Sequence, residues 1–393
     1  MEQKFDFDRV IDRRNTWSIK YDMEGRGKPE NVLPLWVADM DFPAPDCVLE
    51  ALEKQVKHGI FGYSDTDAAY FETLYDWFEK RFGWKTEFDW LVKTPGVVNA
   101  IFTAVRALTE KNDSILIQQP VYYPFMTAAQ KTGRRLIVSE LVNGAGFYGI
   151  DFDDFENQIL QNKVKLFILC NPHNPVGRVW TRAELTRMGE ICVKHGVLVI
   201  SDEIHQDIVY SGHRHLPFAG LCPEFQKITV TCTAPSKTFN LAGLHISNIF
   251  IADSGLRDRF TEEFARTGLS QLSVMGIAAC QAAYRGGEAW LRELLVYLEG
   301  NMMLIEQAMD SVPTIAFRRP EGTYLAWLDL RAFNMNPRKL DQFITREAGL
   351  WLSGGAAFGP SGEGFMRLNA ACPRSLLREA LRRLTRSAAE KLK

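Results

Sequence analysis

The middle of the chain alternates short apolar runs, rich in β-branched residues, with segments of helical periodicity. The runs are ILI at 115–117, LIV at 136–138, LFILC at 166–170, VLVI at 197–200 and ITVTC at 228–232. Runs of this kind are typical of strands that are buried on both faces. Between two of them, residues 181–195 have apolar residues at helical spacing and begin with a capping box of Thr181 and Glu184. Strands that alternate with helices predict an α/β domain with a mostly parallel sheet.

The length of 393 residues exceeds what one ordinary core holds, so we expect two domains. Arg285-Gly286-Gly287 marks a soft boundary between them. After it, the sequence predicts a long helix at 287–310, a strand at 324–330, a helix at 336–347, a Gly-rich loop and a basic, solvated helix at 378–393. We therefore expect an N-terminal arm at 1–45 that contributes to the small domain, a large domain at 46–286 and a smaller α+β domain at 287–393.

Composition argues against several classes of protein. The net charge is −2 without a run of basic residues, which disfavours a nucleic-acid surface. No stretch approaches the roughly 20 apolar residues needed to cross a bilayer, and the N-terminal MEQKFDFDRVIDRR lacks the apolar core of a secretory signal. The seven cysteines are odd in number and form no C-x-x-C pair, which indicates reduced thiols rather than disulfides or a metal site. We expect a cytoplasmic protein without metal.

Polar segments follow three of the predicted strands directly. Ligands of open α/β sheets bind beyond the carboxyl ends of the strands, so these segments are expected to meet at one edge. The segments are Asn171-Pro172-His173-Asn174-Pro175-Val176-Gly177, Ser201-Asp202-Glu203-Ile204-His205 and Thr233-Ala234-Pro235-Ser236-Lys237-Thr238-Phe239-Asn240.

A carboxylate, a lysine and an amide at one sheet edge suit pyridoxal phosphate. This cofactor needs a lysine amine for a Schiff base and an acid beside its pyridine nitrogen, so that the ring withdraws electrons from a carbanion. Lys237 is the candidate for the first task and for the base that removes the α-proton, and Asp202 is the candidate for the second. Each feature taken alone has a plainer interpretation. Asp202 could be a turn residue, Lys237 a solvated surface lysine and the Asn-Pro segment a simple turn. Their common position favours the cofactor site.

A phosphate site is also expected. The segment Lys93-Thr94-Pro95-Gly96-Val97-Val98-Asn99 lies between a strand-like run at 90–92 and a helical pattern at 100–105. A strand, a Gly turn and a helix N-terminus offer backbone N–H groups to an anion. An ordinary β–α turn is the alternative reading.

One motif has a different interpretation. Residues 144–149 match G-x-G-x-x-G, but three aspartates follow the motif closely and position 169 is a leucine where a dinucleotide site needs an acid. We interpret this segment as a hairpin or loop.

At these residues the sequence resembles the fold-type I pyridoxal-phosphate enzymes of the aminotransferase class I/II superfamily. More narrowly, it is similar to the MalY/PatB group of cystathionine β-lyases, which are C–S lyases. The resemblance runs from about residue 36 to 372, nearly the whole chain. The shared segments are 36–42, 62–63, 94–98, 120–124, 171–177, 202–205, 236–244 and 366–369.

The resemblance implies a fold and a set of roles. The fold is a large domain with a mostly parallel sheet flanked by helices, plus a smaller α+β domain. Lys237 would carry the cofactor and shuttle the proton, and Asp202 would pair with the pyridine nitrogen. Asn174 would donate to the phenolic oxygen of the cofactor and Tyr122 would stack on its ring. The backbone N–H groups of Gly96, Val97 and Val98 would hold the phosphate.

Further roles concern the substrate and a second subunit. Arg367 would bind the α-carboxylate of an amino-acid substrate, a task suited to a planar bidentate donor. Ala38 and Tyr122 are expected to contact the substrate as well. Tyr63 would reach the phosphate of a neighbouring subunit, which implies a homodimer with active sites at its interface. Core packing for Tyr122, a turn aromatic for Tyr63 and a surface ion pair for Arg367 are the plainer alternatives.

The chain departs from typical aminotransferases at three positions. His205 stands where they usually have a tyrosine that donates to the cofactor, so we count it among the cofactor residues. Ala234 and His245 stand where they often have phosphate-binding Ser or Thr and Arg, and Ser236 or Thr233 can substitute for the hydroxyl. The histidine at 205 and the absence of an arginine at 245 favour the lyase group.

The sequence therefore predicts β-elimination of a thiol from cystathionine or another S-substituted cysteine, giving pyruvate and ammonia. An aminotransferase is the alternative, because it uses the same residues up to the carbanion. A protein of this fold with a regulatory binding role is a further alternative.

Overall fold

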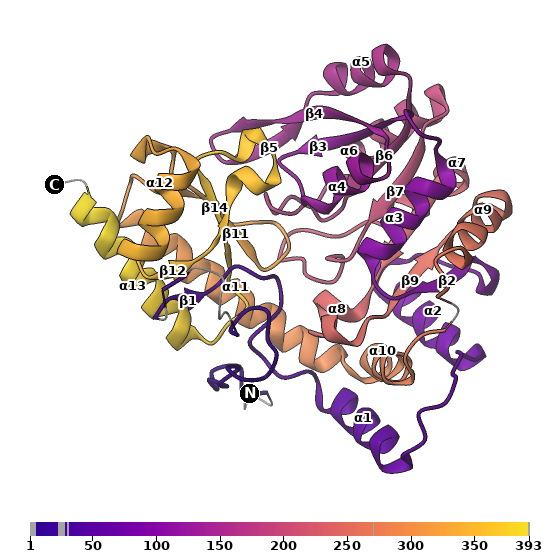
Figure 1. Ribbon diagram of the computed structural model, residues 1–393, viewed down its shortest axis with the longest axis horizontal. Coiled ribbons are helices and arrows are strands. Elements are labelled where there is room, and N and C mark those ends of the chain that lie inside the picture. Colours follow the sequence, from indigo (N-terminus) through magenta and orange to yellow (C-terminus); the bar gives the residue numbers. More distant parts are fainter. Residues whose placement is uncertain (1–4, 23–27, 30, 270, 392–393) are drawn as a thin grey trace.

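The computed structural model describes residues 5–22, 28–29, 31–269 and 271–391. Parts of the predicted N-terminal arm (1–4, 23–27 and 30), residue 270 and the C-terminal residues 392–393 lie outside the described residues. Figure 1 shows a large central sheet with helices on both sides and a smaller group of strands and helices, formed by the C-terminal segment, beside it.

The large sheet has eight strands in the order β2-β9-β8-β7-β6-β3-β4-β5. The four pairs β4-β3, β3-β6, β6-β7 and β7-β8 are parallel. Strands β9 and β5 run opposite to the other described strands of this sheet. The prediction of a mostly parallel sheet is thus confirmed. The strands are β2 (Leu91–Thr94), β3 (Ser114–Gln119), β4 (Arg135–Gly144), β5 (Phe147–Ile150), β6 (Val164–Cys170), β7 (Leu198–Asp202), β8 (Thr229–Thr233) and β9 (Ser247–Phe250).

Both faces of this sheet are covered by helices. In β6, Leu166 and Ile168 pack into one buried cluster while Phe167 and Leu169 pack into another on the opposite face. The first cluster is completed by α3 (Val97–Leu108), α4 (Pro124–Lys131) and α9 (Ser254–Ala265). The second is completed by α5 (Phe152–Asn162), α6 (Arg182–His195) and α7 (Pro223–Lys227). Burial on both faces explains why these strands read as continuous apolar runs.

Local signals in the sequence predicted two connections correctly. The capping box of Thr181 and Glu184 is present at the start of α6. The segment with the Gly-x-Gly-x-x-Gly pattern is the antiparallel hairpin of β4 and β5, and its turn residues Ala145 and Gly146 have φ values of 52° and 84°. A tight turn with two positive φ angles suits a hairpin.

The C-terminal segment builds a four-stranded sheet, β10-β11-β14-β13, against α11 and α13. A separate parallel pair joins β1, near the N-terminus, to β12 and so brings the segment after residue 33 alongside the C-terminal segment. The elements are β1 (Leu33–Pro34), β10 (Ala316–Phe317), β11 (Leu325–Asp329), β12 (Leu350–Trp351), β13 (Ser353–Gly354), β14 (Phe365–Asn369), α11 (Glu288–Asp310), α12 (Pro337–Gln342) and α13 (Arg374–Lys391).

The remaining helices are α1 (Asp46–His58), α2 (Ala68–Phe82), α8 (Pro235–Thr238) and α10 (Val274–Gly286). Two boundaries differ from the prediction. The basic C-terminal helix begins at Arg374 rather than 378, and its first turn buries Leu377 against the rest of the chain. The predicted helix at 336–347 is α12 followed by a π-helical turn at Phe343–Glu347. None of the described helices is both long and apolar enough to span a bilayer.

Candidate active site

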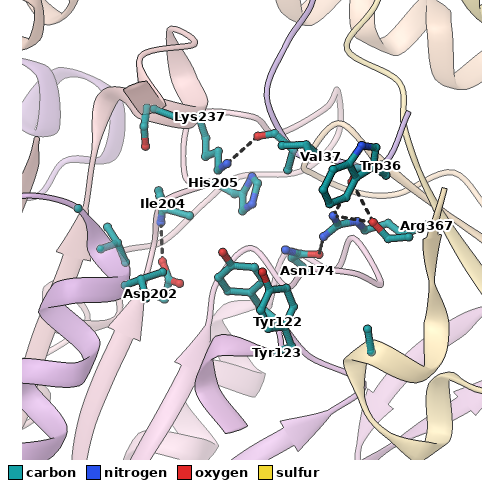
Figure 2. A pocket seen from close by; sticks show the side chains of 18 of the residues that line it. Trp36, Val37, Tyr122, Tyr123, Asn174, Asp202, Ile204, His205, Lys237 and Arg367 are labelled. Carbon is teal, nitrogen blue, oxygen red and sulfur yellow. Dashed lines mark hydrogen bonds between the residues drawn. The ribbon is translucent and has the colours of Figure 1, made fainter. Parts of the chain in front are cut away.

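A cavity of about 580 Å³ opens at the carboxyl ends of β6, β7 and β8. Asn174, Asp202 and Lys237, which follow or end these three strands, all line it, and Arg367 from β14 lines it from the other side. Figure 2 shows Lys237 and Asp202 on one side of the cavity and Arg367 across from them. The structure thus brings together the residues that the sequence predicted at one sheet edge.

Lys237 lies on α8, a single helical turn that starts with Pro235 directly after β8. Its Nζ donates a hydrogen bond of 2.6 Å to the backbone oxygen of Ala38. Burial lowers the pKa of Lys237 from 10.5 to about 8, and the positive charge of Arg367 acts in the same direction. A lysine with a lowered pKa is uncharged in a larger fraction of molecules, as a nucleophilic amine requires.

Asp202 is the last residue of β7 and is 4% exposed. Its Oδ1 accepts one hydrogen bond, of 3.2 Å, from the backbone N–H of Ile204. No cation pairs with this carboxylate among the described residues, and burial raises its pKa from 3.8 to about 7. A protonated pyridine nitrogen would supply the missing partner, so this carboxylate fits pyridoxal phosphate.

Arg367 and Asn174 form a polar pair across the cavity from Lys237. Nη1 of Arg367 donates to Oδ1 of Asn174 at 3.0 Å, and Nη2 donates to the backbone oxygen of Trp36 at 3.0 Å. Nε of Arg367 is buried and has no partner among the described residues. Burial lowers the pKa of Arg367 to about 10, so the guanidinium still carries its charge at neutral pH.

His205 also lines the cavity and is buried at 3% exposure. Burial, together with the charges of Lys237 and Arg367, lowers its pKa well below the usual value, so its ring is neutral at neutral pH. Its Nδ1 has no partner among the described residues. Figure 2 places the ring between Lys237 and Asn174, where the ring can reach a bound ligand.

The expected phosphate cradle is the N-terminus of α3. Gly96 precedes this helix with a φ of 132°, a backbone conformation that favours glycine, and its N–H donates to Ser247 Oγ at 3.1 Å. Val97 and Val98 begin the helix and line the cavity, and N–H groups in the first turn of a helix have no partner inside it. Ser236 and His245 line the cavity as well. These groups fit an anion, with Val97 and Val98 better placed than Gly96 to donate.

Trp36, Val37 and Ala38 line one side of the cavity. Ala38 was predicted to contact the substrate, but the part played by the backbone of this segment was not predicted. The backbone oxygen of Trp36 accepts a hydrogen bond from Arg367, and that of Ala38 accepts one from Lys237. Asn369 Nδ2 donates to the oxygens of Val37 and Asp39, both at 2.6 Å, and so fixes the segment in place. The resemblance had singled out this segment, but backbone carbonyls leave no signal of their own in a sequence.

The remaining lining residues include both predicted and unpredicted ones. The predicted Tyr122 lines the cavity beside Tyr123, whereas Tyr63 does not line it and its side chain is 95% exposed. The unpredicted ones include Tyr123, Ile204, Asp341, Trp351 and Phe358. Most of them are apolar or aromatic, which in a sequence cannot be distinguished from core residues.

Glu203 follows Asp202 directly in the sequence, and its side chain is fully buried. Glu203 accepts hydrogen bonds from Ser201 Oγ at 2.7 Å, from His215 Nε2 at 2.9 Å and from the N–H of Phe218 at 2.9 Å. Replacing Glu203 with alanine leaves these buried donors without an acceptor, and we expect the free energy of unfolding to fall by about 3 kcal/mol. Urea unfolding measures this loss.

Glu224→Ala on the exposed surface of α7 is the matched control for Glu203→Ala, with an expected change within about 0.5 kcal/mol. Equal stability of the two variants would contradict the role of the buried Glu203 carboxylate.

Comparisons with known proteins agree with this geometry. Residues 30–384 match the family described as aminotransferase class I and II. The chain is 43% identical to cystathionine β-lyase PatB of Bacillus subtilis, covering 96% of this chain and 98% of that protein. It is 33% identical to protein MalY of Escherichia coli, covering 96% and 97%.

A solved structure of a pyridoxal-phosphate protein has the same fold as this chain. Cystalysin from Treponema denticola, whose crystal structure contains pyridoxal 5'-phosphate, superposes with a TM-score of 0.96 at 36% identity over the whole of both chains. The prediction of the fold is therefore confirmed. The chain belongs to the aminotransferase class I and II family and has the fold of its pyridoxal-phosphate enzymes of fold type I.

Proposed function

We propose that this protein is a pyridoxal-phosphate-dependent C–S β-lyase that acts on cystathionine or related S-substituted cysteines. One observation carries the proposal: Lys237, Asp202 and Arg367 line a single cavity, and the Asp202 carboxylate has no cationic partner among the described residues. The identity to a cystathionine β-lyase over nearly the whole chain supports this choice within the family.

The residues of the chain divide the chemistry among them. When bound, pyridoxal phosphate supplies an aldehyde for an amine and a ring that withdraws electrons. Asp202 would keep a proton on the ring nitrogen, and Arg367 would fix the α-carboxylate of the substrate. Lys237 Nζ, once free, would take the proton from the α-carbon. The bond between the β-carbon and sulfur then breaks, the sulfur leaves as a thiol after gaining a proton, and water releases the remainder as pyruvate and ammonia.

The lowered pKa of Lys237 predicts how cofactor loading depends on pH. The amine must be uncharged to attack the aldehyde, and its pKa is about 8. We expect the rate of cofactor uptake by the cofactor-free protein to rise about tenfold per pH unit below this pKa and to level off above it. The visible absorbance after mixing reports the rate. A rate that keeps rising steeply to about pH 10 would show a lysine with its ordinary pKa.

The assay for the proposed function is pyruvate release from cystathionine without any keto acid. An aminotransferase, the alternative within this family, would require a keto-acid acceptor such as 2-oxoglutarate. Pyruvate formation that is independent of the keto acid supports the lyase, and strict dependence on it would overturn the lyase assignment.

We also propose a homodimer in the cytoplasm. The loop between α1 and α2 exposes Ile60 at 69%, Phe61 at 61% and Tyr63 at 95%, and Figure 1 shows it at the outer edge of the molecule. Grouped apolar side chains on a surface favour contact with another protein, and Tyr63 would there approach the phosphate of the partner. Light scattering should give twice the chain mass of 44.7 kDa, and a monomer under assay conditions would contradict the proposal.

The seven cysteines, none in a disulfide, suit a reducing compartment.

A further inference from the structure

Asp341 lines the cavity, and the proposed reaction gives it no task. Among the described lining residues, Asp202 and Asp341 are the two carboxylates. Asp202 lies at the end of β7, while Asp341 lies on α12 in the C-terminal segment. Asp341 therefore belongs to the wall of the cavity rather than to the cluster around Lys237.

A pair of stacked indole rings links this wall to Arg367. The rings of Trp36 and Trp351 are parallel within 8° with centroids 4.3 Å apart, and both residues line the cavity. The backbone oxygen of Trp36 accepts from Arg367, so the stack begins beside the group that would hold the α-carboxylate. On the other side, Nζ of Lys28 lies 5.5 Å from the ring centroid of Trp351.

Lys28 and Asp341 form an ion pair at this place. Nζ of Lys28 is 2.8 Å from both carboxylate oxygens of Asp341. The side chains are 18% and 45% exposed, so Asp341 remains accessible from the cavity. A carboxylate offers about four acceptor positions and an ammonium three donors, so each partner retains capacity for a ligand.

We propose that Lys28 and Asp341 recognise the distal end of a leaving group that is itself an amino acid, a specificity determinant that rests on the proposed function. Asp341 accepts hydrogen bonds from the distal ammonium, and Lys28 donates to the distal carboxylate. The methylene chain between the two ends of the substrate lies along the indole rings. A zwitterionic leaving group matches the opposite charges of the pair, whereas a plain alkyl thiol makes none of these contacts.

The test compares cystathionine with S-ethylcysteine, which has no distal charge. For Asp341→Asn, the ratio of kcat/KM for cystathionine to that for S-ethylcysteine should fall about tenfold, the size expected for one charge-assisted hydrogen bond. Lys28→Met, which keeps an apolar stem against Trp351, should lower the ratio similarly. Asp258→Asn, an exposed position on α9 that does not line the cavity, is the matched control and should leave the ratio unchanged.

Two substrates that each carry only one of the two distal charges separate the roles of Asp341 and Lys28. Asp341→Asn should selectively impair cleavage of S-(2-aminoethyl)cysteine, and Lys28→Met that of S-(2-carboxyethyl)cysteine. An equal loss on all substrates, or an unchanged ratio in both variants, would overturn the distal site while leaving the lyase intact. Failure of the unmodified protein to release pyruvate from either cystathionine or S-ethylcysteine would overturn the proposed function and the distal site with it.

Discussion

The Lys237→Ala variant is expected to release pyruvate from cystathionine about a thousandfold more slowly than the unmodified protein. The variant loses both the amine that links to the cofactor and the base that would take the α-proton. Lys237 is the one lysine among the described lining residues. Lys28 is ion-paired with Asp341 on the opposite wall and does not line the cavity, so we expect no other lysine to replace Lys237. The visible absorbance of the lysine-linked cofactor should disappear at the same time.

Lys227→Ala is the matched control for this variant, since Lys227 lies exposed at the end of α7 and outside the cavity. It should keep both the absorbance and the rate. A Lys237→Ala protein with an unchanged spectrum after cofactor loading would show that the cofactor is attached elsewhere, and the assignment of Lys237 would be wrong.

The second large effect is expected at Arg367. Replacing it with lysine keeps the positive charge but removes the planar pair of donors that fits a carboxylate. We expect kcat/KM for cystathionine to fall about a hundredfold, mostly through a higher KM, because substrate positioning is lost while Lys237 and Asp202 remain. Steady-state kinetics give the two parameters separately, and the absorbance of the bound cofactor should be retained.

Arg338→Lys on the exposed surface of α12 serves as the matched control for the change at Arg367. A loss confined to kcat with an unaltered KM would contradict the role of Arg367 in substrate binding. Loss of the cofactor absorbance would instead indicate that Arg367 holds the cofactor site together through its contact with Asn174.

The part of the site at the sheet edge was predictable, because its residues follow or end strands in the sequence. Asn174, Asp202 and Lys237 follow or end three buried runs, and adjacent parallel strands must bring their carboxyl ends to one edge. The hairpin at residues 144–149 and the capping box at Thr181 were predictable for a similar reason, since turns and caps depend on a few neighbouring residues.

The walls of the site were not predictable in the same way. The hydrogen bond from Lys237 to Ala38 joins residues 199 positions apart, and that from Arg367 to Asn174 joins residues 193 apart. Such contacts depend on how the N-terminal segment packs, and only the resemblance pointed to that segment. The pairing of β1 with β12 and the ion pair of Lys28 with Asp341 left no periodic signal in the sequence. The division of the chain at residue 286 stays a prediction, as do the individual roles of the site residues.

The product balance of the reaction tests the central claim most directly. Purified, cofactor-loaded protein is incubated with cystathionine in the absence of any keto acid, and thiol, pyruvate and ammonia are measured over one time course. The proposed β-elimination predicts equal amounts of all three products, with almost none from Lys237→Ala. Intact cystathionine that reacts only after 2-oxoglutarate is added, with glutamate as the product, would contradict the account.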